Sequence, residues 1–208
     1  MHWNEPLKNC APNSPLERTR YTAPLSLCVR APGKVVRTIL RISHLADHPE
    51  AIPVVRKWFE VEWAAYYGPG GPGDAERDLL AYSRRGQLPV GLIAFYDEQL
   101  CGIAALTAHS IRTHPHLSPW AAAGLVRPPF RGRGVGSALL RALEEVARGL
   151  GYAIMYCGTA SAMGLLERHG WRCLERVIYE GEQVSIYHKA LSQDAPPDAS
   201  PAARVPRR

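Results

Sequence analysis

The spacing of apolar residues changes several times along the chain, and each change marks a new structural element. Alternation with a period of two begins at residues 36–42, which predicts a strand. Apolar residues then follow a helical spacing from Pro49 to Tyr67, and the glycine- and proline-rich run 68–73 ends this helix. A second short helix is expected over 74–84. The chain therefore opens with a strand and two helices.

Strand patterns dominate the middle of the chain. Val90–Tyr96 and Gln99–Leu106 flank the polar turn Asp97-Glu98, which predicts a hairpin. A third strand, 120–126, is rich in alanine and glycine, and side chains this small indicate that something approaches its backbone closely.

Helix and strand patterns alternate again in the last third. A helix is expected from residue 135 to residue 150, because its apolar residues share one face. A strand over 152–157 and a helix over 162–169 follow, and the hairpin 172–179 with 183–190 closes the pattern. The order of elements predicts a mixed α/β fold across residues 36–190, with helices flanking the sheet.

The two ends differ from this patterned region. Residues 1–35 contain five prolines and little periodicity, and residues 191–208 are rich in proline, alanine and arginine. Both are expected to be irregular or disordered.

Charge follows the same division. The net charge is +6, but residues 1–37 hold six basic and two acidic residues, and residues 191–208 hold three basic and two acidic residues. These ends account for +4 and +1, which leaves +1 for everything between them. A nearly neutral domain has no basic stripe for a phosphate backbone, so nucleic acid is not the expected partner.

Two further features concern the compartment. No apolar run reaches the roughly 20 residues that a membrane-spanning helix needs, and the first residues lack a signal-peptide pattern, so a cytoplasmic location is expected. The five cysteines are scattered without a Cys-x-x-Cys pair, which disfavours zinc ribbons and disulfide frameworks. Cys157 lies on a predicted strand, and its thiol is either a buried inert group or a nucleophile.

The run Arg131-Gly132-Arg133-Gly134-Val135-Gly136 joins the third strand to the following helix. Glycines at alternate positions let successive backbone N–H groups converge, and the helix start adds its positive end, so the run predicts an anion site. It is neither a nucleoside-triphosphate loop, since Gly-Lys-Ser/Thr is missing, nor a dinucleotide fingerprint, since Ser137 stands at the place of the last glycine.

With the upstream Val-x-Pro, this run resembles the acyl-coenzyme A motif of the GNAT acetyltransferase superfamily, Arg/Gln-x-x-Gly-x-Gly/Ala. The likeness continues to Gly170-Trp171, which resembles the family's closing segment. The resemblance implies a mixed, mostly antiparallel seven-stranded sheet flanked by helices, in which the cofactor enters between splayed central strands. It also implies acetyl-CoA as the acyl donor.

The same resemblance implies roles for particular residues. Backbone groups of Leu125 and Val126 would pair with the pantetheine amides, and one of their N–H groups would polarise the thioester carbonyl. The backbone of the loop and the Arg131 side chain would hold the pyrophosphate, with the cofactor-binding residues being Arg131, Gly132, Arg133, Gly134, Val135 and Gly136.

One departure from the family affects the proton chemistry. Leu166 stands where many members have a tyrosine that acts as an acid. Tyr156 and His116 are the substitute catalytic candidates, with His109 and His114 as alternatives to His116. Each has an ordinary structural reading, as a core aromatic or as a polar loop residue.

The residues that would bind the acceptor are harder to identify from the sequence than those that would bind the cofactor. Glu60 and Glu62 on the first helix could bind or deprotonate a cationic amine, or could simply form a solvated helix face. The region around 68–73 is either a flexible lid over the substrate or a solvated connector. His114-Pro-His116 offers only two ligands, so no metal is expected.

Two functions from different classes remain. The first is transfer of an acetyl group from acetyl-CoA to a primary amine, on a small molecule or a protein N-terminus. The second, suggested by Leu166, is a regulatory protein that binds acyl-CoA without catalysis. The sequence leaves open whether the protein forms a homodimer.

Overall fold

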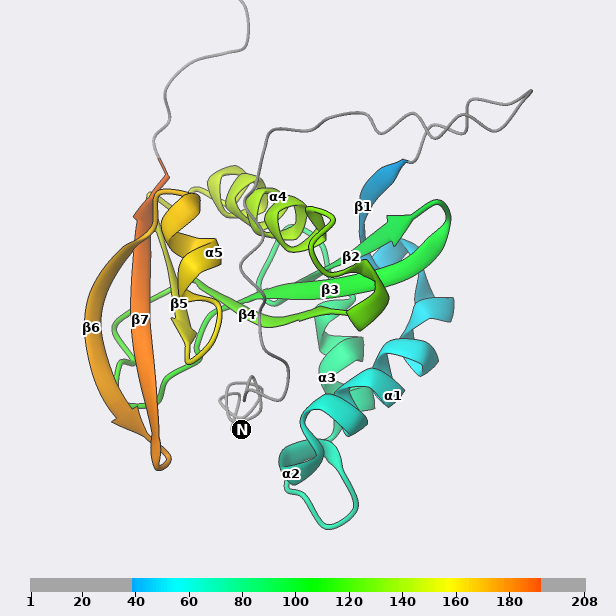
Figure 1. The fold of residues 1–208 in the computed structure, drawn as a ribbon, viewed down its shortest axis with the longest axis horizontal. Helices are drawn as coiled ribbons and strands as arrows, with labels where there is room; N and C mark the ends of the chain where they lie inside the picture. The colour runs from blue at the N-terminus through cyan, green and yellow to red at the C-terminus, as the bar shows by residue number, and fades with distance from the viewer. Residues whose placement is uncertain (1–38, 192–208) are drawn as a thin grey trace, which may run out of the picture.

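In the computed structural model, residues 39–191 can be described, and Figure 1 shows their arrangement. The irregular ends expected at 1–35 and 191–208 lie outside these residues except for Leu191, which is buried. Seven strands form one sheet in the order β1-β2-β3-β4-β5-β7-β6. All neighbouring strands are antiparallel except β4 and β5, which run parallel. The mixed, mostly antiparallel sheet that was predicted is therefore confirmed.

The first half contains the strand, helices and hairpin that the pattern predicts. Its elements are β1 (Leu40–His44), α1 (Ile52–Glu62), α2 (Ala64–Tyr67), α3 (Ala75–Tyr82), β2 (Val90–Tyr96) and β3 (Gln99–Thr107). The single helix predicted over 49–67 is wrong in detail. A 3-10 turn precedes it, and Trp63 interrupts it with φ −119° and ψ 52°.

The second half contains β4 (Trp120–Val126), α4 (Val135–Gly149), β5 (Ile154–Thr159), α5 (Met163–Arg168), β6 (Arg172–Tyr179) and β7 (Glu182–Ala190). β5 begins two residues later than predicted. The reason is the end of α4, where Gly151 has φ +85° and the Tyr152 N–H donates to Ala147 O at 3.0 Å. Tyr152 thus belongs to the helix cap.

Helices cover both faces of the sheet (Figure 1). α4 and α5 pack on one face, in a buried cluster that includes Leu139, Leu143 and Leu166. α1, α2 and α3 pack on the other face, in a cluster that includes Phe59, Trp63 and Leu79. A third cluster joins the loop before β4 to β6 and β7.

The glycine-rich segment 68–73, expected to be either a flexible lid or a solvated connector, forms a hydrogen-bonded turn. The Gly71 N–H donates to Gly68 O and the Gly73 N–H donates to Tyr66 O, both at 2.9 Å. A Cβ on Gly73 would lie 2.4 Å from Tyr66 Cε1. Glycine is needed here because two tyrosine side chains pack against the backbone, and this packing fixes how α2 leads into α3.

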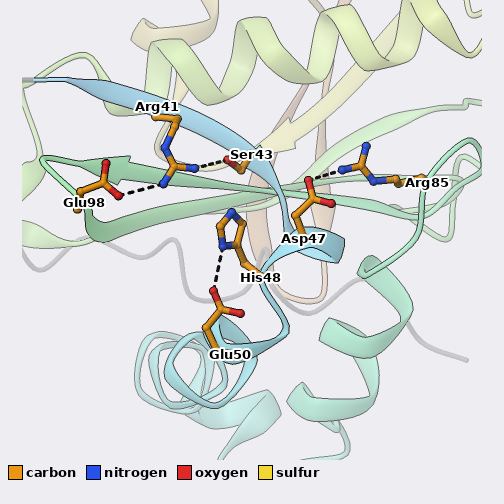
Figure 2. A network of polar contacts seen from close by, with 7 residues as sticks. All are labelled: Arg41, Ser43, Asp47, His48, Glu50, Arg85 and Glu98. Carbon is orange, nitrogen blue, oxygen red and sulfur yellow. Dashed lines mark hydrogen bonds and ion pairs between the residues drawn. The ribbon is translucent and has the colours of Figure 1, made fainter.

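A polar network fastens β1 and the following turn to the rest of the molecule (Figure 2). Arg41 donates to Ser43 Oγ at 2.7 Å and pairs with Glu98 of the β2–β3 turn at 3.4 Å. Asp47 pairs with Arg85, which follows α3, and the Arg85 guanidinium holds the pKa of Asp47 below its usual value. The network therefore links β1 and the following turn to segments that lie 38 and 57 residues further along the chain.

Candidate functional site

The inner strands of the sheet separate next to the glycine loop. β4 and β5 pair only through Trp120 with Tyr156 and Ala121 with Cys157. Beyond these pairs β4 continues along β3 and β5 continues along β7. A parallel pair that stops after two residues leaves the later backbone groups of both strands available for another partner. The splay of the central strands that the family resemblance implied is thus present.

A β-bulge shapes β4 at this point. Between Ile103–Leu125 and Ala105–Ala122, β4 has one residue more than β3, and Ala123 has a positive φ of 51°. A positive φ is unusual for alanine, so the surrounding packing must hold it. Sequence reasoning missed this bulge, and only the run of small residues hinted at an unusual backbone.

Leu125 and Val126 point their backbone groups in opposite directions. The Arg127 N–H donates to Cys101 O at 2.9 Å, so the flanking pair Val126–Gly102 is of the non-hydrogen-bonded kind. The Val126 N–H and C=O are therefore turned away from β3. By alternation, those of Leu125 are turned toward β3. Of the two predicted pantetheine contacts, Val126 has the suitable orientation.

The glycine loop takes the backbone conformation that its sequence suggests. Gly132 and Gly134 have φ values of +74° and +81°, and a Cβ on either would meet no atom within 4 Å. Gly134 is the N-cap of α4, and the first helical bond runs from the Ala138 N–H to Gly134 O at 3.0 Å. The N–H groups of Val135, Gly136 and Ser137 thus have no helical partner, as at any helix start. Residues 131–136, where phosphate binding is expected, are called the phosphate cradle below.

Gly136 and the following turn connect the cradle to α5. A Cβ on Gly136 would lie 3.5 Å from Leu165 Cδ2 and 4.0 Å from Val126 Cγ2. Ser137 Oγ lies 2.9 Å from His169 Nε2 at the end of α5. Burial, followed by the nearby Arg141 guanidinium, holds the pKa of His169 below its usual value. The neutral imidazole is therefore favoured beside the start of α4.

The arginines around the cradle lie against groups of this chain. Arg131 Nε donates to Val126 O at 2.9 Å, and its Nη2 lies 4.0 Å from Glu62 Oε1. Arg127 stands 5.5 Å from the centre of the Trp58 ring. Arg133 lies over Tyr96 and Phe130. Sequence reasoning missed Trp58, which carries no motif and is recognised only from its contact with Arg127.

The two glutamates that were candidates on α1 have different surroundings. Glu60 accepts from Arg56 Nε at 2.7 Å, and the same arginine reaches Glu76 of α3 at 2.8 Å. Glu62 instead approaches Arg131 at the cradle. The structure therefore separates Glu60, which belongs to a surface network between helices, from Glu62, which lies beside residues 131–136.

Tyr156 and the histidines lie near the start of β4, at the opposite end of this strand from the phosphate cradle. The Tyr156 ring is half-buried, 5.7 Å from the Trp120 ring, where β4 and β5 still pair. His114 bonds to Glu175 of β6 at 2.8 Å, which ties the loop before β4 to the sheet edge. His116 is exposed with its ring 5.9 Å from His114, and His109 is exposed as well.

Leu166 and Cys157 complete the predicted positions. Leu166 is 2% exposed and packs in the α4 cluster, so it presents no polar group. Cys157 is half-buried in the strand pair with Ala121, beside that cluster. The Cys101 thiol is fully buried, which raises its pKa to about 11 and makes it unreactive.

Within residues 39–191, no three His, Cys, Asp or Glu side chains are grouped so that they could hold a metal ion. In the same part of the chain, no helix combines the length and the apolar character that crossing a bilayer requires.

Solved structures with similar folds include several acetyltransferases. The structure of yncA from Salmonella typhimurium, with its cofactor acetyl-CoA, is 20% identical with a TM-score of 0.55 and covers 78% of this chain and 99% of its own. An aminoglycoside 6'-N-acetyltransferase complexed with coenzyme A is 12% identical, with a TM-score of 0.60 and coverage of 75% and 99%. An N-acetyltransferase from Staphylococcus aureus Mu50 is 15% identical, with a TM-score of 0.56 and coverage of 74% and 99%. At these identities the likeness concerns the fold.

A search of curated proteins found no match. A family model, described as the acetyltransferase (GNAT) family, matches residues 55–171, which is more than half of the chain. The matched segment runs from α1 through the splayed strands and the phosphate cradle to Trp171. On this match, together with the parallel β4–β5 pair, the chain belongs to the GNAT acetyltransferase family.

Proposed function

We propose that the protein transfers the acetyl group of acetyl-CoA to a primary amine, on a small molecule or a protein N-terminus, by direct attack of the amine on the thioester. The observation that carries this proposal is the early end of the β4–β5 pairing beside the phosphate cradle. Together they offer an extended backbone edge for pantetheine and a set of N–H donors for pyrophosphate.

The residues present fit such a ligand. Glycine at positions 132 and 134 keeps the cradle free of side chains, since a Cβ there would point into open space. The Val126 N–H and C=O face away from β3 and suit the amides of an extended arm. Arg131 and Arg133 add positive charge next to the helix start, where phosphate oxygens would lie.

Acetyl transfer from a thioester needs only limited acid–base catalysis from side chains. A thiolate leaves readily because thiol pKa values lie near 8.5, so positioning and donors aimed at the developing oxyanion supply most of the rate. Tyr156 is proposed to protonate the leaving sulfur from the adjacent strand. His116 is proposed to accept a proton from the amine. Proton transfer of this kind contributes about 10²–10⁴-fold.

Calorimetric titration tests the cofactor part of the proposal. The purified protein is titrated with acetyl-CoA, with dephospho-CoA and ATP as comparisons. Selective binding of acetyl-CoA supports the assignment, and its absence would mean that the glycine loop serves only the fold. For Tyr156→Phe, turnover with a reactive amine should fall about 10²-fold with little change in acetyl-CoA affinity. An unchanged rate would remove Tyr156 as the proton donor.

Buried Leu166 favours a second function, binding of acyl-CoA in a regulatory role without catalysis. It stands where many members of the family have a tyrosine, and its burial leaves no polar group there. A panel of amines distinguishes the two functions. Release of free CoA with any amine supports catalysis, whereas tight binding without release across the panel supports the regulatory role.

A further inference from the structure

One face of α1 presents two groups that bind cations, and arginines from the segment after β4 contact both. Trp58 and Glu62 are four residues apart on α1 and so lie on the same face, one turn from each other. Arg127 stands over the Trp58 ring at 5.5 Å, and Arg131 Nη2 lies 4.0 Å from Glu62 Oε1. An aromatic face and a carboxylate are the usual partners of an alkylammonium group.

The neighbouring Glu60 shows that this arrangement is particular to one face. Its side chain is 35% exposed, close to the 37% of Glu62, and it also belongs to α1. Its partner is Arg56 on the same helix, at 2.7 Å. Glu60 therefore resembles Glu62 in exposure and charge, but it does not face the cofactor loop.

Arg131 connects the acceptor side to the cofactor side. Its Nε donates to Val126 O, on the strand edge proposed for pantetheine, while the same guanidinium approaches Glu62. If the Arg131 guanidinium turns to a pyrophosphate in the cradle, Val126 O and the Glu62 carboxylate each lose their contact with it. An exposed ion pair at 4.0 Å contributes about 0–1 kcal/mol, whereas arginine binds phosphate through paired, charge-assisted hydrogen bonds. Exchange toward phosphate is thus favourable.

We propose that Trp58 and Glu62 form the subsite for a positively charged group of the acceptor, and that Arg131 controls it by leaving Glu62 when the cofactor binds. This inference rests on the proposed function. It makes the binding of the two substrates cooperative, with the cofactor first, because the carboxylate gains a new cation only after it loses the arginine.

The class of acceptor follows from the charge. The amine that attacks the thioester must be neutral, so the group held by Glu62 is a second, protonated amine on the same molecule. Diamines and polyamines meet this requirement, while simple monoamines do not. A probe with two amines separated by a short chain, such as 1,4-diaminobutane, matches it, with 1-aminobutane as the control of equal length.

Calorimetry with CoA in place of acetyl-CoA tests the subsite without turnover. Wild-type protein saturated with CoA should bind 1,4-diaminobutane about two- to fivefold more tightly than protein without CoA, and more tightly than it binds 1-aminobutane. Glu62→Gln should lose at least tenfold of this affinity, while the matched variant Glu60→Gln should keep it. Acetyl-CoA should bind Glu62→Gln as well as wild type or up to about fivefold more tightly, because the competing ion pair is gone.

The outcomes separate the two proposals. If acetyl-CoA does not bind the wild type, the proposed function fails. If acetyl-CoA binds but the diamine does not bind, binds equally without CoA, or binds Glu62→Gln as it binds the wild type, the subsite is wrong and the proposed function stands. Equal losses in Glu60→Gln and Glu62→Gln would also overturn it, since a general charge effect would then explain the binding.

Discussion

The two sides of the sheet that meet at β4 are built from different parts of the polypeptide. On the α4 side, the candidate cofactor site consists mainly of main-chain groups: the Val126 N–H and C=O, the left-handed glycines of the cradle, and the start of α4. On the α1 side, the features near β4 are side chains, among them Trp58, Glu62 and the buried tyrosines.

This difference explains which half of the site can be read from a sequence. Main-chain binding needs glycine at fixed places, because only glycine takes a positive φ without strain and leaves the space clear. Side-chain binding has no such constraint, so its residues can differ from protein to protein on one fold. The cofactor side is thus recognisable, and the acceptor side has to be seen in three dimensions.

The largest effect is expected at Gly134. Gly134→Glu places bulk and negative charge in the cradle, and acetyl-CoA affinity should fall at least 100-fold by calorimetry. Gly151→Glu is the matched control, because Gly151 also has a left-handed φ, at the other end of α4. Both variants should lose about 1–2 kcal/mol of unfolding free energy from backbone strain. Equal affinities in the two variants would contradict a main-chain phosphate site.

Glu144 tests whether the α4 side also depends on a side chain. It is 2% exposed and accepts from Trp171 Nε1 at 2.9 Å and from Lys189 Nζ at 2.7 Å. Glu144→Ala should lower the unfolding free energy by about 3 kcal/mol, since two donors lose a buried acceptor. Exposed Glu145→Ala should change it by less than about 0.5 kcal/mol. Urea denaturation measures both, and similar small losses would show that this contact is dispensable.

Tyr67 provides the corresponding test on the α1 side. Its hydroxyl donates to Asp78 Oδ2 at 2.8 Å, and burial raises the pKa of that carboxyl. Tyr67→Phe should cost about 1–2 kcal/mol by thermal or urea unfolding, because Asp78 loses its donor. Acetyl-CoA affinity should not change. A weaker affinity in this variant, but not in the control Tyr152→Phe, would mean that the two sides are not independent.

The smallest expected effect is a pH dependence from His169. Burial holds its folded pKa below the usual histidine value of about 6.5, so the unfolded chain binds more protons as the pH falls below 6.5. The contribution of His169 to the free energy of unfolding is therefore complete above pH 6.5 and is lost as the pH falls through its folded pKa. The loss should be a few tenths of a kcal/mol after solvent screening. His169→Gln should reduce this slope and exposed His116→Gln should keep it, as followed by urea unfolding at pH 7 and pH 5.

Much of the fold could be predicted because, in most elements, the spacing of apolar residues agreed with the turn and capping residues at the ends. The hairpin β2–β3 and helix α4 have nearly the expected bounds, since Asp97-Glu98 and Gly134 mark their limits plainly. The backbone conformation of the cradle was predicted from the spacing of its glycines. These features depend on local backbone conformation, which short stretches of sequence encode directly.

The errors arose where tertiary packing overrides the local pattern. The break at Trp63 keeps that side chain in the α1 cluster. The bulge at Ala123 has no turn residue to signal it. Glu60 and Glu62 could not be told apart, because their difference depends on Arg131, which lies about seventy residues away along the chain.

The brief pairing of β4 with β5 also has a mechanical consequence. Two residue pairs join a block of four strands to a block of three, whereas every other junction in the sheet has at least five pairs. Few ladder bonds resist bending along this line, so the sheet is most compliant there. A pull that separated the two blocks would part them at the same line where the substrates are proposed to meet.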